Sequence, residues 1–414
     1  MKRSCLYLTG LLLSALLLAP GLSRAQADAD DGAFTPANPP DMKPLASHHT
    51  PAYRAAGMFE HGANLGNYLE APPGSSWGVT VSAGEFAQMK REGFDHVRVP
   101  IGWQHYAGPA PDFTLSPEIF RRVDFVVTNA LANRLAVMIN IHHFDELDEN
   151  PAAATDEFLK IWAQIAAHYR DFPERLAFEL DNEPHGNATT VLMNPIYARA
   201  IALIRESNPR RTIFVEPGRW GSIAELKNLV LPPDDNVIVS VHCYEPFHFT
   251  HQGADWAGAE VRQTGIIFPG PPAQPLVPDP TLDLKPWVLD WIRKYNTLPT
   301  AQNPSSALAF TGKLKYVHDW SDFYGRPAHL GEFGAYTKAD QSSRAHFYAA
   351  VRRTAEAQNL GWCIWDWSAG FRYWDKTTGQ PLPGMHNALF GPPAAVPGEG
   401  LTPSKHSSDF ESAP

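Results

Sequence analysis

The chain has few cysteines and only one long apolar run, at its N-terminus. It holds three cysteines in 414 residues, and no CxxC or HExxH spacing typical of a zinc site occurs. Cys5 lies in the apolar start, whereas Cys243 and Cys363 lie in strand-like runs, where two buried thiols or a disulfide are both compatible with the sequence. We therefore predict neither a metal nor a cofactor.

Basic residues are also scarce relative to acids. The 34 Lys and Arg against 44 Asp and Glu give a net charge of −10. An acidic surface argues against nucleic acid or anionic membranes as partners, because both carry the same sign of charge. This negative charge would neither attract nor repel a neutral polysaccharide.

The N-terminus has the layout of a secretory signal peptide. Two basic residues precede an apolar run over 6–18, and a helix-breaking Pro20-Gly21 leads to a small-residue site that ends at Ala25. The run is shorter than the roughly 20 residues that a membrane span needs. We therefore predict that residues 1–25 are removed, that the protein is secreted or periplasmic, and that the mature protein has no membrane segment.

The remaining chain predicts one domain between two tails. Residues 26–51 are rich in Ala, Asp and Pro and are expected to form a disordered leader, and 392–414 a disordered tail. Residues 52–391 are long enough for a single decorated barrel domain, and no internal repeat is visible. We expect this domain to act as a monomer.

Apolar runs alternate with amphipathic segments, which is typical of a parallel α/β fold. The expected strands are Phe59–Leu65, His96–Pro100, Leu135–Ile141, Leu176–Leu180, Thr212–Glu216, Val237–His242, Ala328–Gly331 and Trp362–Trp367. The expected helices are Ala83–Glu92, Pro117–Arg134, Asp156–Tyr169, Pro195–Ser207, Ile223–Leu229, Lys313–Phe323 and Ser342–Ala357, with a weakly marked eighth at Met385–Phe390. This count predicts a closed (β/α)₈ TIM barrel. An open doubly wound sheet is the alternative, but no GxGxxG turn follows the first strand.

Every expected strand ends in polar or aromatic side chains. In order along the chain these are Asn64 and Asn67, Arg98, His142 and His143, Asn182 and Glu183, Glu216, His242 and Tyr244, Glu332, and Trp365 and Trp367. A single strand-end polar residue is usually a structural hydrogen-bonding group. Catalytic groups of this fold gather at the carboxyl ends of the strands, so polar residues at all eight exits predict an active site there.

Two of these exits carry the glutamates expected to be catalytic. Glu183 and Glu332 follow the fourth and seventh strands, which lie on opposite sides of an eight-stranded barrel, so their side chains can meet over its axis. A carboxylate pair about 5 Å apart is typical of retaining glycosidases. Arg98 with Tyr244 could keep Glu332 ionised, and Asn182 could bind the sugar 2-hydroxyl.

Imidazole and indole rings complete the expected site. His142, His143 and His242 could bind sugar hydroxyls and tune the acid, although purely structural roles are the alternative. Sugars stack on aromatic rings, and Trp365 is the best placed of the twelve tryptophans to form the floor of the site. Four further tryptophans could contact sugar or belong to the core, namely Trp103, Trp220, Trp256 and Trp367.

Six stretches resemble glycoside hydrolase family five, the cellulase family of retaining enzymes on a (β/α)₈ barrel. They span residues 64–72, 96–100, 139–143, 182–187, 249–256 and 331–336, and the pairing of Asn182-Glu183-Pro184 with Gly331-Glu332-Phe333-Gly334 is highly specific. Thermophilic endoglucanases of the family, some of which also accept mannan, are the most similar. The resemblance implies that Glu183 is the acid/base and Glu332 the nucleophile. It also implies substrate-binding or supporting roles for Asn67, Glu70, Arg98, His142, His143, Asn182, His242, Tyr244 and Trp365.

Two features depart from those relatives. The eighth strand ends Trp365-Asp366-Trp367, where relatives carry Phe at the third position, and the proline-rich segment 257–312 after the sixth strand is longer. Long connections inside a barrel are usually functional or disordered. We expect this segment to wall the cleft, with Trp287 or Trp291 touching substrate. The alternative is a loosely packed excursion with a short helix near Pro286–Lys294.

These observations predict a secreted retaining endo-β-1,4-glycanase, in the first place an endoglucanase, that acts on a β-linked polysaccharide. A β-mannanase or β-1,3-glucanase on the same scaffold is the alternative within the enzyme class. If the protein is not an enzyme, the alternative is a non-catalytic carbohydrate-binding barrel. That alternative would require a defect in the carboxylate pair or in the residues that support it.

Overall fold

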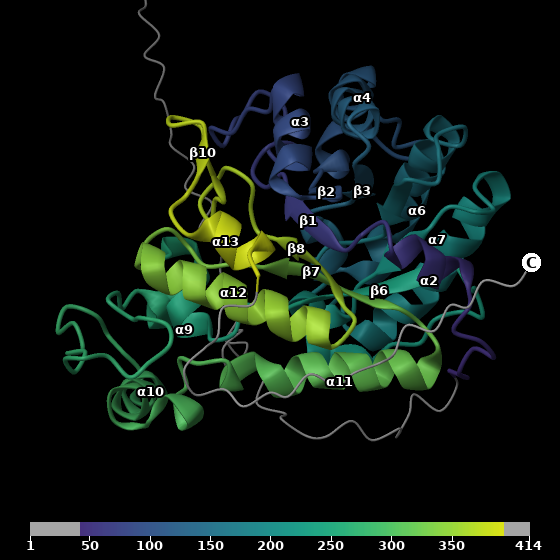
Figure 1. Ribbon diagram of the computed structural model, residues 1–414. Coiled ribbons are helices and arrows are strands. Elements are labelled where there is room, and N and C mark those ends of the chain that lie inside the picture. The colour runs from purple at the N-terminus through teal and green to yellow at the C-terminus, as the bar shows by residue number, and fades with distance from the viewer. Residues whose placement is uncertain (1–41, 393–414) are drawn as a thin grey trace, which may run out of the picture.

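The computed structural model describes residues 42–392. Eight parallel strands close into a barrel in the order β1 to β8, with β8 paired to β1 (Figure 1). The predicted (β/α)₈ barrel is confirmed, and the open doubly wound sheet is excluded. The strands are β1 (His61–Asn64), β2 (His96–Val99), β3 (Ala136–Asn140), β4 (Leu176–Glu179), β5 (Ile213–Val215), β6 (Val237–His242), β7 (Ala328–Phe333) and β8 (Gly361–Ile364).

Helices connect the strands and surround the barrel (Figure 1). They are α2 (Pro51–Ala56), α3 (Ala83–Glu92), α4 (Pro117–Ala132), α5 (Asp145–Glu149), α6 (Pro151–His168), α7 (Thr190–Ser207), α8 (Gly218–Gly221), α9 (Phe247–Thr250), α10 (Pro286–Thr297), α11 (Leu308–Tyr324), α12 (Gln341–Ala357) and α13 (Met385–Phe390). Short 3₁₀ helices span Trp103–Tyr106, Ile223–Asn228, Asp255–Ala257, Ala259–Val261 and Thr300–Gln302, and a small hairpin joins β9 (Trp374–Asp375) to β10 (Gln380–Pro381).

Element ends differ from the expectation where local capping overrides it. The helix expected to begin at Pro195 begins at Thr190, because the Thr189 side chain caps it by accepting from the Leu192 amide. The strand expected to reach Trp367 ends at Ile364. Trp365 therefore belongs to the loop after β8, on the face where active sites of this fold lie.

Alternation along the strands directs polar side chains into the barrel. Along β2, Val97 and Val99 join the main apolar core, whereas Arg98 between them is also fully buried but bonds to side chains from other strands. Successive side chains of a strand point to opposite faces, so Arg98 points inward. A separate small apolar cluster joins α2 and the segment before β1 to strands β3 to β6, and it consists of Ala52, Ala55, Phe59, Ala136, Met138, Ala177, Phe214 and Ile238.

The described part of the expected leader is packed rather than free. Met42 is buried, the Leu45 amide bonds to the Tyr324 carbonyl at 3.0 Å, and Thr50 caps α2. The domain therefore begins before the expected residue 52, because apolar side chains in 42–51 find partners on the barrel. The expected signal peptide and almost all of the expected tail lie outside the described residues. Within 42–392, no helix is long and apolar enough to cross a membrane.

Side-chain amides hold the long segment after β6. Gln252 accepts from the Ile266 amide at 3.1 Å and donates to its carbonyl at 2.9 Å, and Asn296 makes the equivalent two bonds with Leu276 at 2.8 and 2.9 Å. The expected short helix is present as α10, and Figure 1 shows it beside α9. These bonds fix the segment at Ile266 and Leu276.

Candidate active site

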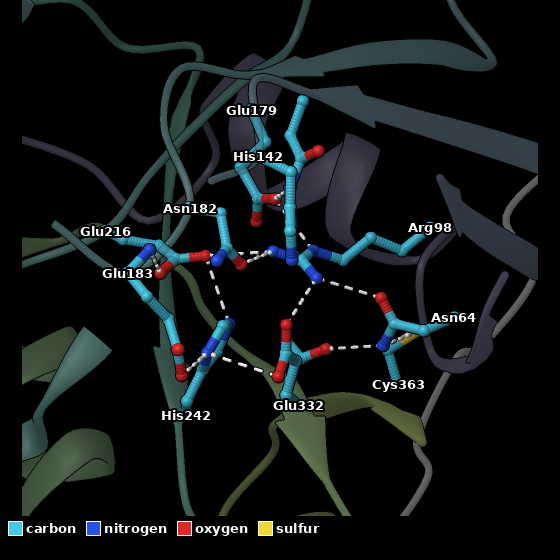
Figure 2. Close-up of polar contacts among 12 residues, drawn as sticks. Asn64, Arg98, His142, Glu179, Asn182, Glu183, Glu216, His242, Glu332 and Cys363 are labelled. Carbon is cyan, nitrogen blue, oxygen red and sulfur yellow. Dashed lines mark hydrogen bonds and ion pairs between the residues drawn. The ribbon is translucent and has the colours of Figure 1, made fainter. Parts of the chain in front are cut away.

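Arg98 lies at the centre of the polar cluster at the strand exits (Figure 2). It is fully buried and donates hydrogen bonds to five side chains, namely Glu179 at 2.7 Å, Asn64 at 2.9 Å, Glu332 at 2.7 Å, Asn182 at 2.7 Å and Glu216 at 3.1 Å. Burial alone would lower the pKa of Arg98, but the three carboxylates raise it above its usual value. One permanent cation on β2 thus joins residues from the ends of four other strands.

Glu332 is held at both carboxylate oxygens. Oε1 accepts from Arg98, and Oε2 accepts from the Tyr244 hydroxyl at 2.7 Å. Glu332 is only 4% exposed, so little of it besides these bonded oxygens is open to solvent. The structure therefore brings together the three residues that the sequence associated with the nucleophile.

Glu183 approaches Glu332 from the exit of β4. Its backbone is left-handed, with φ +52°, and its amide donates to Glu216 Oε2 at 2.8 Å. Its Oε1 lies 2.8 Å from His242 Nδ1. One carboxylate oxygen of Glu183, one of Glu332 and a ring nitrogen of His242 all lie within 4.8 Å of one another. The two glutamates thus lie on either side of the His242 ring (Figure 2).

His242 is enclosed by carboxyl groups. Beyond its bond to Glu183, its Nε2 lies 3.0 Å from Glu216 Oε1 and its Nδ1 lies 3.6 Å from Glu332 Oε2. Burial disfavours the charged ring, but Glu216 and Glu332 raise the pKa of His242 to about 10. The carboxylates around His242 therefore favour its protonated form.

Glu183, His242 and Glu332 also have the residue types of a metal site. Glu332 already accepts from Arg98 and from the Tyr244 hydroxyl, and Glu183 lies 2.8 Å from the His242 ring. The carboxylates of this cluster are thus already paired with donors of the protein. Among the described residues, this cluster fits proton transfer better than binding of a cation.

Two buried glutamates extend the site beyond the expected residues. Glu179, within β4, accepts from Arg98 and from Asn140 at 2.9 Å, and the sequence-based interpretation missed it. Glu216 was expected only as a polar strand end. Burial raises the pKa of Glu216 to about 7, although His242 lowers it. The available signal was an acid within or ending an apolar strand, since buried acids are costly unless paired.

Trp365 and His142 form a stacked pair beside the carboxylates. Their ring centroids are 5.8 Å apart and their planes differ by 5°. Burial, with the nearby His143 and Arg98, lowers the pKa of His142 well below its usual value, so this imidazole is neutral. Gly66 allows the loop after β1 to reach the pair, because a Cβ there would lie 2.9 Å from the Trp365 ring. The half-buried Trp365 thus presents a rigid aromatic floor.

Glu70 organises the turn after β1. Its carboxylate is fully buried and accepts from the amides of Asn67, Tyr68 and Leu69 at 2.6, 2.7 and 3.0 Å. These bonds hold Asn67 in a left-handed conformation with φ +65°. Glu70 therefore has a supporting place in the structure, whereas Asn67 is half-buried and can reach a ligand.

The four weaker tryptophan candidates divide into core and surface. Trp103 and Trp367 are fully buried, so for them core packing is correct and sugar contact is excluded. Trp256 is 64% exposed. Trp220 is half-buried and stacks on His185, with centroids 5.0 Å apart. Size and aromaticity alone cannot separate these cases, because tryptophan is used both in cores and at binding surfaces.

Other rings lie around the rim. His143 is exposed and meets the ring of Trp77, which is 44% exposed, at 5.9 Å. Trp287 and Trp291 of α10 pack against His248 at 5.4 and 4.7 Å. Contact of either α10 tryptophan with substrate remains a prediction.

Cys243 and Cys363 are both buried and do not form a disulfide, so the disulfide alternative is wrong. Cys363 accepts a hydrogen bond from Asn64 Nδ2 at 3.3 Å, and burial raises its pKa well above the usual value. The same amide group also bonds to the carbonyls of Gly331 and Ile364. Asn64 thus links the exits of β1, β7 and β8 to Arg98.

Comparison with known proteins agrees with this geometry. Residues 60–370 match the model for cellulases of glycosyl hydrolase family 5. The structure of a hyperthermophilic endo-β-1,4-glucanase in complex with substrate is 34% identical, with a TM-score of 0.72 over 82% of this chain and 99% of that chain. A Thermotoga maritima endoglucanase in complex with mannotriose is 33% identical, with a TM-score of 0.71 over the same shares.

Curated relatives include longer proteins. Endoglucanase H of Acetivibrio thermocellus is 29% identical over 79% of this chain and 31% of its own length, and this chain spans about a third of the first two relatives matched. Endoglucanase A of Paenibacillus barcinonensis is 25% identical over 81% of this chain and 86% of its own length. The family match and the structural likeness together show that this chain belongs to glycosyl hydrolase family 5, the cellulase family of glycoside hydrolases.

Proposed function

We propose that this chain is a retaining endo-β-1,4-glucanase, with Glu332 as the nucleophile and Glu183 as the acid/base. The carboxylate separation carries the proposal, because oxygens of the two glutamates lie within 4.8 Å. Retaining glycosidases hold their carboxyl groups about 5–5.5 Å apart, whereas inverting enzymes need about 6.5–9.5 Å to admit a water molecule. The observed spacing supports direct attack by a carboxylate.

The first step forms a covalent intermediate. A Glu332 oxygen attacks the anomeric carbon and forms an ester bond while the glycosidic C–O bond breaks. Glu183 gives its proton to the departing oxygen, so the leaving sugar departs as an alcohol. Arg98 and Tyr244 fix the attacking carboxylate, which reduces the reorganisation required in the transition state.

The second step reverses these roles. The Glu183 carboxylate takes a proton from water, the water oxygen attacks the anomeric carbon, and the ester bond to Glu332 breaks. Two inversions at one carbon return its original configuration. His242, 2.8 Å from Glu183, is placed to stabilise that carboxylate between the steps.

Asn182 and Trp365 are suited to bind the sugar at the scissile bond. Asn182 Oδ1 accepts from Arg98, which fixes the amide at the exit of β4 with its Nδ2 group and the second lone pair of Oδ1 left for a sugar hydroxyl. Hydrogen bonds with the sugar 2-hydroxyl strengthen as the transition state develops. The Trp365 indole offers a flat face for the sugar C–H bonds.

The substrate assignment follows the relatives. The similar structures include an endo-β-1,4-glucanase bound to substrate, which favours β-1,4-glucan. A related structure bound to mannotriose makes β-mannan a second candidate. The two sugars differ at the 2-hydroxyl, the group that Asn182 would contact.

Hydrolysis of barley β-glucan and carboxymethylcellulose, with a rapid fall in viscosity, is the expected result for an endo-acting enzyme. Nuclear magnetic resonance of the first product formed should show the β-anomer before mutarotation, because two displacements retain configuration. An initial α-anomer would exclude the proposed mechanism. Turnover confined to mannan or β-1,3-glucan would change the substrate. Oligosaccharide binding without hydrolysis of any polysaccharide would favour the non-catalytic barrel.

We further propose that the protein is exported after cleavage beyond Ala25. N-terminal sequencing of protein recovered outside the cytoplasm is expected to start at Gln26. Recovery only from the cytoplasm with Met1 retained would contradict export. This test does not depend on the catalytic mechanism.

A further inference from the structure

Glu216 touches each part of the acid/base machinery from the exit of β5. Its fully buried carboxylate accepts from the Glu183 amide at 2.8 Å through Oε2, while Oε1 lies 3.0 Å from His242 Nε2 and 3.1 Å from Arg98 Nη2. Figure 2 shows it between the Glu183 backbone and the imidazole. Glu216 is too deeply buried to touch substrate, so any effect it has on catalysis must act through these partners.

The first effect is on the direction of Glu183. A left-handed backbone is uncommon for a residue with a side chain, and the conformation with φ +52° needs support from its surroundings. The bond from the Glu183 amide to Glu216 supplies that support directly. It fixes the peptide from which the acid/base side chain projects toward the cleft.

The second effect is on charge around His242. The ring faces Glu183 through Nδ1 and Glu216 through Nε2, and Glu332 lies 3.6 Å away. Arg98, Glu179, Asp181 and Tyr197 also act on Glu216. His142 and His329 act on His242. Glu183 and His242 are in contact, so they titrate as a pair. A negative charge beside this pair raises its affinity for protons, and removing that charge lowers it.

We propose that Glu216 is a positioning residue that keeps the catalytic proton on the Glu183–His242 pair and aims Glu183 at the leaving oxygen. This role rests on the proposed retaining mechanism, in which Glu183 must be protonated for the first step. In this role Glu216 sets the pH above which activity is lost, and it does not bind substrate.

The test compares Glu216→Gln, Glu216→Asp and Glu179→Gln, using aryl β-cellobiosides with a poor and a good leaving group. For Glu216→Gln, the alkaline limb of the kcat/KM profile should move to lower pH by about one unit, since the pair loses its proton more easily. The kcat/KM value should fall about 10-fold or more with the poor leaving group, because that group must be protonated by Glu183 as it departs. It should fall less than about 3-fold with dinitrophenolate, because that anion departs without being protonated.

Two variants provide the matched comparison. Glu216→Asp keeps the charge but withdraws it by one methylene, so a smaller shift of the alkaline limb in the same direction is expected. Glu179→Gln removes another fully buried carboxylate that contacts Arg98 but neither Glu183 nor His242. It should reduce kcat/KM by similar factors for both leaving groups and leave the alkaline limb in place.

The outcomes separate this role from the mechanism itself. If the wild-type protein hydrolyses no glycoside, the proposed function fails. If it does, but Glu216→Gln loses equal factors with both leaving groups and keeps the wild-type alkaline limb, Glu216 is only structural and the inference is overturned. Should Glu216→Gln not fold, the Glu216→Asp profile decides, because an unshifted alkaline limb there would equally overturn it.

Discussion

Replacing Glu332 by glutamine is expected to reduce kcat by about 10³-fold or more, since a neutral amide cannot form the glycosyl ester. Glutamine has the same shape and can still accept from Arg98 or Tyr244, so substrate binding should persist. The measurement is steady-state hydrolysis of β-glucan, together with mass analysis of wild-type enzyme inactivated by a 2-fluoro-cellobioside. The label is expected on the peptide that carries Glu332.

The fold of the Glu332→Gln variant should remain intact. Arg98 retains its carboxylate partners Glu179 and Glu216, so the cation stays compensated. Unfolding of wild type and variant followed side by side checks this point. Unchanged turnover in a folded variant, or a label on another residue, would remove Glu332 from the nucleophile role.

Replacing Arg98 by alanine is expected to lower both stability and activity. The change would leave the carboxylates of Glu179, Glu216 and Glu332 buried without the guanidinium that joins them. Removing one partner of a buried ion pair costs about 3–5 kcal/mol of unfolding free energy, because an uncompensated charge remains. Activity should fall about 10²-fold or more, since Glu332 loses a fixed donor. Urea unfolding and kcat on β-glucan measure the two effects.

The stability deficit of Arg98→Ala should depend on pH. Without the guanidinium, burial and mutual repulsion raise the carboxyl pKa values in the folded protein above their unfolded values. Such groups stabilise the fold when protonated and destabilise it as pH rises, so the deficit should be smaller at pH 5 than at pH 8. A deficit that does not change with pH would contradict this explanation.

Two further variants serve as controls for Arg98→Ala. Arg98→Lys keeps the charge but cannot donate to five acceptors, so intermediate stability is expected. Arg293→Ala removes an exposed arginine that forms an ion pair with Asp290 one helical turn away, and should change the unfolding free energy by no more than about 0.5 kcal/mol. If Arg98→Ala and Arg293→Ala lose the same unfolding free energy, the buried ion pairs of Arg98 stabilise the fold no more than an exposed pair does.

The strand-end residues illustrate what could be predicted. Parallel strands in a closed barrel deliver their carboxyl ends to one face, so Glu183 and Glu332 had to approach each other once the strand count was correct. The same rule placed Arg98, His242 and Tyr244 near them. These predictions depend only on strand order and on the alternation of side chains, both of which can be read from local pattern.

Other residues could not be assigned from local pattern. Glu179 lies inside an apolar run, and its role depends on Arg98 reaching it from β2, 81 residues earlier. Trp103 and Trp365 are both tryptophans near strand exits, yet one is core and the other faces the cleft. Burial of a given ring depends on which loops cover it, and the sequence near the ring does not contain that information.

The amino-acid sequence by itself determined the barrel, the family and the two glutamates, because periodicity and strand-end chemistry are local properties. Tertiary structure alone decided the approach of their carboxylates to within 4.8 Å, the left-handed turn at Glu183 and the three contacts of Glu216. Those features depend on rotamers and on hydrogen bonds between segments far apart in the chain. Such distances are set only when all eight strands have closed.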